Sequence, residues 1–325
     1  MTLIRPSRRD ILKMSAAAPM LGMAAPAIAN IGGPDGDQPS HFRFTLGAAR
    51  MTVVSDGYFT APISSVGVNA DPEEVRAFME AHFLLSEDRV LNHTNHIIIE
   101  LGDAKVLVDV GSGKRIYENT AGNLLENMEA AGFAQEDITH VALTHAHPDH
   151  VWGTRDDFDD VLFPDAEYIM GAFEFDWWMK PGLIDEVPEN MQQLVVGAVN
   201  ALTPIQEQTT MAEDGHEIAP GITMIASPGH TLGHMSLHIE SEGEQLLVLA
   251  DSSRRAYLNF EHPEWIGSVD MDPEATVRTR KRLLDMAATD KMSVLGYHFP
   301  FPGVGNVVKE GAAYRFIPAL WRWDK

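Results

Sequence analysis

The sequence contains no cysteine among its 325 residues. This absence excludes disulfide bonds, thiolate metal ligands and a cysteine nucleophile. Any metal bound by this chain must therefore be held by imidazoles and carboxylates, and the 14 histidines supply the imidazoles.

Positive charge is also scarce in this chain. Lys and Arg number 24 against 47 Asp and Glu, which gives a formal net charge of -23. Such a surface repels phosphate backbones, so nucleic acid is not expected as a partner, although a need for solubility alone also explains the acidic balance. A hydrophobic content of 45% at this length permits one large α/β domain or two small ones.

Residues 1–29 are expected to be an export signal rather than part of the folded domain. Their basic residues are Arg5, Arg8, Arg9 and Lys13. A run of small apolar residues follows, and Ala27-Ile28-Ala29 offers a cleavage site. The segment beginning Ser7-Arg8-Arg9 resembles the twin-arginine export motif, and a chance arginine pair in an ordinary secretory signal or a membrane-retained leader is the alternative. We therefore expect a periplasmic or secreted protein.

The rest of the chain is expected to form a flexible leader over residues 30–41 and one folded domain over residues 42–325. The leader is rich in Gly, Pro, Asp and Ser and has little apolar content to pack. No later apolar run is long enough to span a bilayer, so we expect no stable membrane insertion after processing.

Short β-branched runs alternate with helical patterns along the domain, which indicates a layered α/β fold. Strands are expected at residues 95–101, 105–110, 140–143, 217–227 and 245–250, and helices at residues 123–131 and 273–287. Residues 71–85 are expected to form an amphipathic helix that packs on the core, or alternatively part of a lid or dimer contact.

The strongest signal is the motif Thr144-His145-Ala146-His147-Pro148-Asp149-His150. Two imidazoles two residues apart on an extended segment point the same way, so His145 and His147 can bind one ion. Asp149 and His150 follow a turn at Pro148 and can face a second ion. Such a pattern arises by chance in on the order of one shuffled chain in several hundred.

Three further candidate ligands follow apolar, strand-like runs. His230 comes after the run at residues 217–227, Asp251 directly follows Ala250, and His298 comes after residues 293–296. Because loops at strand ends can converge on one site, these side chains are candidates to complete a two-metal site.

The order of these candidate ligands along the chain resembles that of the metallo-β-lactamase superfamily. The four-ligand motif comes first, followed by a Gly-His pair, an aspartate after a strand and a late histidine. The resemblance covers essentially the whole domain and implies an α/β fold, a four-layer αββα sandwich with its site along one edge of two sheets. It implies that His145, His147 and His230 bind a first metal, that Asp149, His150 and His298 bind a second, and that Asp251 bridges them.

Other polar residues are expected to support these ligands. His234 lies four residues beyond a ligand, and we expect a supporting role for it. Asp56-Gly57 and Asp109-x-Gly111 look like the superfamily's turn positions, where an aspartate can orient a ligating histidine and a glycine permits close backbone approach.

Two divalent ions about 3.5–4 Å apart can share one water and lower its pKa, which makes a bridging hydroxide available as the nucleophile. Zinc is the expected metal, although His and Asp ligands also accept Mn, Co or Fe. Asp149 and Asp251 are the expected catalytic residues, with Asp149 also moving a proton toward the leaving group.

The bridging Asp251 and the absent cysteines resemble the lactonase, glyoxalase-type and organophosphate-hydrolase branches rather than the true β-lactamases. Within these branches, the length, export signal, ligand order and late His298-Phe-Pro-Phe-Pro-Gly segment look most like the methyl parathion hydrolase and lactonase group. This resemblance implies a hydrolase that cleaves small, apolar, ester-like substrates such as lactones, aryl esters or organophosphate triesters. A periplasmic β-lactamase or a glyoxalase-type thioesterase on the same fold is the alternative. A homodimer is suggested by the resemblance alone.

Aromatic residues near the ligands are candidates for an apolar substrate pocket. Phe173, Trp177 and Trp178 lie on a predicted helix after the metal motif, and Phe299 follows His298. The alternative is that these rings are core residues at helical spacing.

Overall fold

The computed structural model describes residues 39–113, 116, 120–156 and 158–320. The predicted signal at residues 1–29 and most of the predicted leader lie outside the described residues. The first strand begins at His41, so the last residue of the predicted leader belongs to a sheet. Within the described part of the chain, no helix is both long and apolar enough to cross a membrane.

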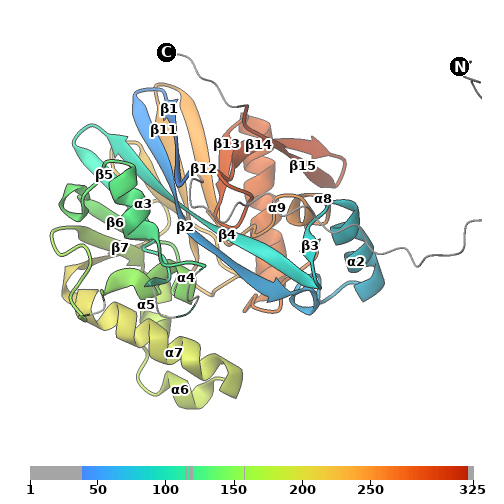
Figure 1. Cartoon of the computed structure of the whole chain (residues 1–325), viewed down its shortest axis with the longest axis horizontal. Helices are drawn as coiled ribbons and strands as arrows, with labels where there is room; N and C mark the ends of the chain where they lie inside the picture. Colours follow the sequence, from blue (N-terminus) through green and yellow to red (C-terminus); the bar gives the residue numbers. More distant parts are fainter. Residues whose placement is uncertain (1–38, 114–115, 117–119, 157, 321–325) are drawn as a thin grey trace, which may run out of the picture.

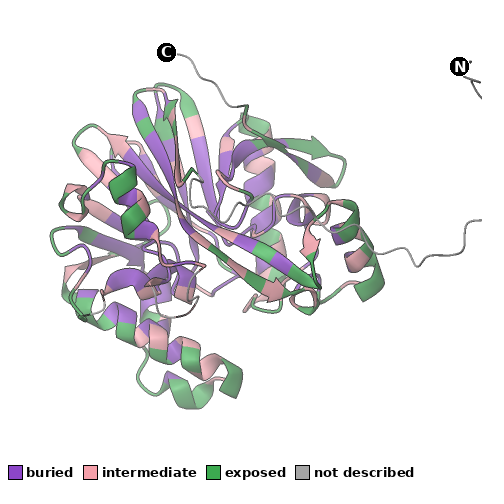
Figure 2. Cartoon of the chain, in the orientation of Figure 1, coloured by how far each residue is buried: buried purple, intermediate pink, exposed green. Residues whose placement is uncertain are grey.

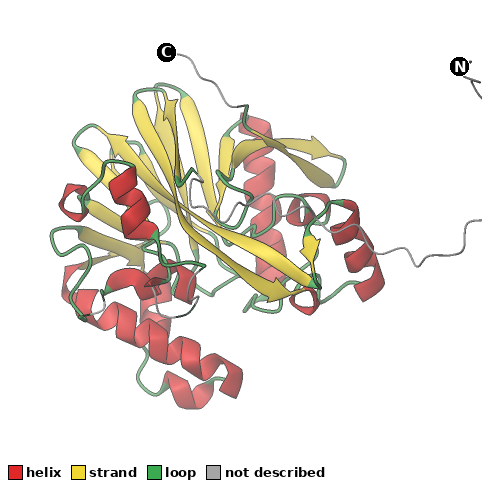
Figure 3. Ribbon diagram, in the orientation of Figure 1, coloured by secondary structure: helices red, strands yellow, loops and turns green. Residues whose placement is uncertain are grey.

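Two β-sheets lie at the centre of the molecule (Figures 1 and 3). The first sheet contains β1 (His41–Leu46), β2 (Ala49–Pro62), β3 (Leu85–Ser86), β4 (Arg89–Leu101), β5 (Ala104–Val108), β6 (His140–Leu143), β7 (Glu167–Gly171) and β8 (Thr209–Ala212). Its strand order is β1-β2-β4-β5-β6-β7-β8, and β3 pairs with β4.

The second sheet contains β9 (Glu217–Ala219), β10 (Ile222–Ala226), β11 (Met235–Ser241), β12 (Glu244–Ala250), β13 (Ser293–Gly296), β14 (Val304–Glu310) and β15 (Ala313–Pro318). Its order is β15-β14-β13-β12-β11-β10-β9. In both sheets antiparallel pairs predominate, with parallel pairing from β5 to β8 and between β12 and β13.

Helices cover the outer faces of the two sheets (Figure 1). The helices of the described residues are α2 (Pro72–Ala81), α3 (Leu124–Ala130), α4 (Pro148–Val151), α5 (Ala172–Trp178), α6 (Leu183–Glu186), α7 (Glu189–Leu202), α8 (Leu258–Glu261) and α9 (Pro273–Asp290). Short 3₁₀ turns lie at Ile63–Ser65, Gln135–Asp137, Trp152–Thr154 and Thr203–Gln208.

The pleat of β4 explains why its isoleucine run is buried on both faces (Figure 2). Ile97 and Ile99 belong to the core between the two sheets, whereas Ile98 belongs to the core beneath α3, α5 and α7. In β12, Leu246 likewise faces the first sheet and Leu247 faces α9. The layers therefore run helix, sheet, sheet, helix, and the predicted αββα sandwich is confirmed.

Two expected strands are shorter than predicted. The strand at residues 105–110 ends before Asp109, because that residue adopts a left-handed conformation with φ 60°. The run at residues 217–227 divides into β9 and β10, because Pro220 cannot donate to the sheet and Gly221 turns the chain with φ 85°.

The segment at residues 71–85 is a shorter helix that packs on the core. Asp71 begins α2, and its side chain accepts a hydrogen bond from the Glu73 backbone N–H. Val75 and Met79 are buried in a small apolar cluster with Trp265. The interpretation of this segment as a core-packed amphipathic helix is therefore confirmed.

Strand direction brings the polar loops to one edge of the sandwich. β10, β12 and β13 point the same way, since β11 is antiparallel to both β10 and β12, and β12 is parallel to β13. Their carboxyl ends lead into His230, Asp251 and His298, and β6 leads into His145. The four loops thus start from buried, hydrogen-bonded strands.

Candidate metal centre

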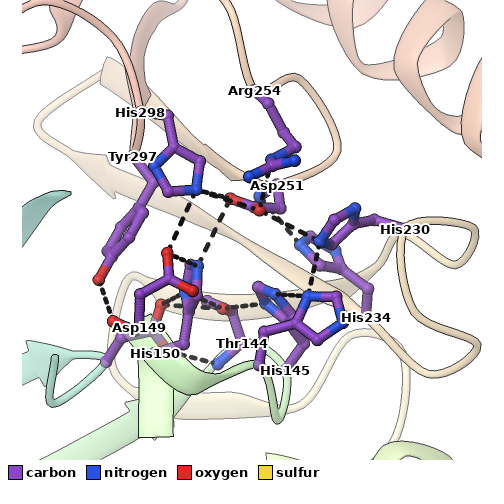
Figure 4. Close-up of polar contacts among 12 residues, drawn as sticks. Thr144, His145, Asp149, His150, His230, His234, Asp251, Arg254, Tyr297 and His298 are labelled. Carbon is purple, nitrogen blue, oxygen red and sulfur yellow. Dashed lines mark hydrogen bonds and ion pairs between the residues drawn. The ribbon is translucent and has the colours of Figure 1, made fainter. Parts of the chain in front are cut away.

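Buried imidazoles and carboxylates from these four loops meet at one point (Figure 4). The structure brings together all of the predicted ligand residues, namely His145, His147, Asp149, His150, His230, Asp251 and His298, and each is buried. We call His145, His147 and His230 the first donor group, and Asp149, His150 and His298 the second donor group.

The first donor group has the spacing of ligands around one ion. The Nδ1 atom of His147 lies 3.2 Å from Nε2 of His145 and 2.9 Å from Nε2 of His230. Ligand nitrogens bound at 2.0–2.1 Å to one tetrahedral ion lie about 3.3 Å apart. Burial and the neighbouring imidazoles hold the pKa values of His145 and His147 well below the usual value, so both side chains are neutral, as metal ligands must be.

The second donor group leaves buried polar atoms without partners. Oδ2 of Asp149 lies 3.4 Å from Nε2 of His298 and 3.6 Å from Nε2 of His150. Neither Oδ2 of Asp149 nor Nε2 of His150 has a hydrogen-bond partner among the described residues. Unpaired buried atoms of this kind cost free energy, and a cation between them satisfies both.

Asp251 faces both donor groups. Its Oδ2 atom lies 3.1 Å from Nε2 of His230 and 3.2 Å from Nε2 of His298. Its Oδ1 atom lies 3.5 Å from Nε2 of His150 and 3.2 Å from Nε2 of His298. Burial alone would raise the pKa of Asp251, but His298, His230 and the Arg254 guanidinium hold it well below the usual value. An ionised carboxylate that lies beside both groups is placed to bridge two cations.

The electrostatics of His150 show that this site attracts positive charge. Burial alone would lower the pKa of His150, yet the carboxylates of Asp149, Asp109 and Asp251 together raise it to about 10. The carboxylates therefore stabilise a cation at this position. Divalent ions supply such charge, so the donor set fits two of them.

Asp109 orients one ligand and the loop that carries it. Its carboxylate accepts from Nδ1 of His150 at 2.7 Å and from the N–H and hydroxyl of Thr144, both at 2.8 Å. A proton on Nδ1 leaves Nε2 of His150 free to bind a metal. The supporting role predicted for Asp109 is confirmed.

His234 supports Asp251 from behind. Burial and the neighbouring His230 lower the pKa of His234 to about 3, so its imidazole is neutral. Its Nε2 accepts from the Asp251 backbone N–H at 3.1 Å, and its Nδ1 lies 2.7 Å from the Ser227 hydroxyl. This contact confirms the predicted supporting role.

Asp56 acts on the backbone rather than on a ligand. Its carboxylate accepts from the backbone N–H groups of Ser112 and Leu124, at 3.2 and 2.9 Å. These bonds join β2 to the start of α3. The prediction that Asp56 orients a histidine is therefore corrected, because the bonds it makes are to a loop that carries none of the predicted ligands.

Sequence reasoning missed several partners of the ligands, including Arg254 beside Asp251 and the Tyr297 hydroxyl, which donates to the Asp149 carbonyl. Asp270 accepts from Nδ1 of His230 at 2.8 Å, and the backbone carbonyl of His93 accepts from Nδ1 of His298 at 2.7 Å. Asp270 lies in no motif and 40 residues from its partner. A carbonyl acceptor has no signature in the side-chain sequence.

Two of the four aromatic residues predicted to line a pocket, Trp178 and Phe299, are instead buried in the core. Trp178 has no exposed surface, and its indole N–H donates to Glu174 at 2.7 Å. Phe299 has no exposed surface either, because it points away from His298 into the core beneath α9. Phe173 is 62% exposed and Trp177 half-buried, so both can still meet a ligand from solvent.

Asp109→Asn should weaken metal binding about 10–100-fold, because the amide cannot hold the His150 tautomer as a carboxylate does. Chelator competition with metal analysis measures the change. Asp137→Asn is the matched control, since that carboxylate pairs with Lys105 away from the centre. Equal metal affinity in the two variants would contradict the role given to Asp109.

Comparison with known proteins identifies the family. The family model described as the Metallo-beta-lactamase superfamily matches residues 89–295. The structure resembles AidC, a dizinc quorum-quenching lactonase solved in complex with a product, at 26% identity and TM-score 0.82, covering 87% of this chain and 98% of that one. It also resembles the hydrolase AbOPH of the β-lactamase superfamily, at 25% identity and TM-score 0.82, covering 88% and 99%.

Curated relatives agree with the structures. The N-acyl homoserine lactonase AiiA of Bacillus thuringiensis subsp. kurstaki is 23% identical over 219 residues, which span 62% of this chain and 79% of the relative. The Metallo-beta-lactamase domain-containing protein 1 of Xenopus laevis is 25% identical over 260 residues, which span 78% and 90%. The chain belongs to the metallo-β-lactamase superfamily and is a metal-dependent hydrolase with a site for two divalent ions.

Proposed function

We propose that the chain is a lactonase, with N-acyl homoserine lactones as its substrate class. The observation that carries the proposal is the pair of donor groups joined by Asp251, on a fold that superimposes on almost the whole of a dizinc lactonase. Zinc is the proposed metal for the same reason.

The two donor groups would hold one ion each, and Asp251 would lie between the ions. When bound, two divalent ions polarise the ester carbonyl and lower the pKa of the attacking water. The chain's own part is to fix these donors, which it does by burying them and by binding the far nitrogens of His150 and His230 to Asp109 and Asp270.

Ring opening adds water across the acyl C–O bond, and the departing ring oxygen must gain a proton. Asp149 is proposed to take the proton that the attacking water loses and pass it to the ring oxygen, because its carboxylate lies in the centre and its side chain is 8% exposed. Asp149→Asn is therefore expected to slow esters with poor leaving groups more than activated aryl esters. Steady-state rates on the two substrate types, at matched metal content, measure this. If both substrate types are slowed equally, Asp149 does not transfer the proton to the leaving group.

Arg254 places a positive charge at the edge of the centre (Figure 4). Its Nε lies 3.0 Å from Oδ2 of Asp251, and its side chain is 13% exposed. Hydrolysis of a lactone creates a carboxylate, and a guanidinium binds such an anion strongly. Arg254 is therefore proposed to contact the acyl group as its negative charge develops.

Arg254→Met should reduce kcat/KM for lactones roughly 10–100-fold, the value of one hydrogen bond to a charged group. The matched control is Arg278→Met, on the exposed face of α9, where the arginine pairs with Glu274. Metal content is measured in parallel. If the Arg254 variant instead loses metal but keeps a normal kcat/KM per bound metal pair, the role of Arg254 is to hold Asp251 in place rather than to contact the substrate.

An apolar ring also borders the centre. Phe59 lies edge-on to His298, with ring centroids 5.4 Å apart, and it belongs to the part of β2 that extends beyond the core. A half-buried ring at this position favours substrates with an apolar portion, such as an acyl chain.

Substrate class is tested with a panel assayed on purified, metal-analysed protein. The panel contains an acyl-homoserine lactone, dihydrocoumarin, an aryl acetate, a paraoxon-type triester and a cephalosporin. We expect the highest kcat/KM on the lactones, with slower turnover of the aryl ester and the triester, whose electrophilic centres the same site can polarise. Turnover of the cephalosporin alone would contradict the proposal and favour a β-lactamase.

A further inference from the structure

Glu174 is a buried carboxylate that lies outside the donor groups. It belongs to α5, and its side chain is among the most deeply buried charged groups at 1% exposure. Its Oε1 accepts from the Ala146 backbone N–H at 3.0 Å and from the Trp178 indole at 2.7 Å. Its Oε2 accepts from the Gly233 backbone N–H at 2.9 Å.

The two backbone donors belong to the two loops that carry the first donor group. Ala146 lies between His145 and His147, and Gly233 lies in the loop between β10 and β11, which carries His230. One carboxylate therefore joins the two segments whose separation sets the size of the first metal site. The second donor group takes Asp149 and His150 from the same segment as His145 and His147, but its third member, His298, comes from another loop.

The packing leaves this contact little freedom. A Cβ atom on Gly233 would lie 2.3 Å from the Glu174 backbone nitrogen, so the loop rests directly on α5. Only a carboxylate matches the three donors, because a glutamine amide has one acceptor oxygen and would present N–H groups to another N–H.

Burying this charge is costly. Burial raises the pKa of Glu174, and the hydrogen bonds from Ala146, Trp178 and Gly233 partly offset that effect. An apolar side chain would fill the same space without the desolvation penalty. A carboxylate at this buried position is explained if the two oxygens of Glu174 hold the two loops at a fixed separation.

We propose that Glu174 is a positioning residue for the first metal, which sets the separation of the His145–His147 segment and the His230 loop. The inference concerns the metal centre and does not depend on which substrate the centre cleaves. It predicts that loss of the carboxylate selectively weakens binding of the ion at the first donor group. Binding at the second donor group should persist, because Asp109 and the His93 carbonyl still hold His150 and His298.

Glu174→Gln is the direct test, with Asp56→Asn as the matched control. Asp56 is also a fully buried carboxylate that accepts from two backbone N–H groups and a hydroxyl, but it ties a loop that carries none of the predicted ligands. Each protein is titrated with a chelator, and zinc per chain and the unfolding midpoint of the metal-free form are recorded.

We expect Glu174→Gln to release one of its two ions at chelator concentrations about 10–100-fold below those needed for the unaltered protein. The second ion should be released normally, and the metal-free midpoint should fall about as much as in Asp56→Asn. Crystals of Glu174→Gln grown in limiting zinc should show lower anomalous occupancy at the first donor group than at the second.

Gly233→Ala is a second variant that keeps the carboxylate. Its methyl group pushes the His230 loop away from α5, so it should also weaken the first ion selectively. Two results would overturn the proposal and leave Glu174 with a purely structural role. One is an equal loss of affinity for both ions, and the other is zinc affinities no different from those of Asp56→Asn. If Glu174→Gln does not fold, Gly233→Ala decides by the same criteria.

Discussion

Asp149 and Asp251 are buried among imidazoles at one edge of a β-sandwich, and the rest of the structure depends on how that buried charge is compensated. A carboxylate removed from water loses several kcal/mol of hydration unless charge and hydrogen bonds replace it. Oxygens of both residues lack hydrogen-bond partners among the described residues, and the surrounding imidazole nitrogens converge on them. Cations are the groups that complete this arrangement.

The fold meets this requirement by placing rigid strands behind each donor. β6, β10, β12 and β13 end at the same edge, so the ligands leave buried sheets rather than long loops. Asp109, Asp270, His234 and Glu174 then fix the side chains and backbones from behind. Arg254, which is proposed to contact the substrate, lies at the rim with its Nε 3.0 Å from Oδ2 of Asp251.

Much of the centre could be predicted from the sequence because its chemistry is local. His145, His147, Asp149 and His150 lie within one short motif, and the other donors each follow an apolar run that ends at a strand terminus. The αββα layers followed from a family resemblance, and the layered α/β class followed from short β-branched runs that alternate with helical patterns. Ile98 shows why the patterns succeed, since a fully apolar run indicates a strand buried on both faces.

What could not be predicted depends on contacts between distant segments. Asp270 and Glu174 act on loops far from them in sequence, and no local pattern marks such pairs. The apolar residues around Asp109 favoured a strand through residue 110, but the left-handed backbone conformation of Asp109 ends the strand before it. The aromatic residues were misplaced because helical spacing does not say which face of α5 meets the core, and Trp178 lies on the buried face.

The most direct test of the central claim is anomalous scattering at the zinc edge from crystals of the zinc-loaded protein. Two peaks are expected, about 3.5–4 Å apart, with Asp251 between them. One peak should lie within the group His145, His147 and His230, and the other within the group Asp149, His150 and His298. A single peak, or two peaks that Asp251 does not bridge, would contradict the account.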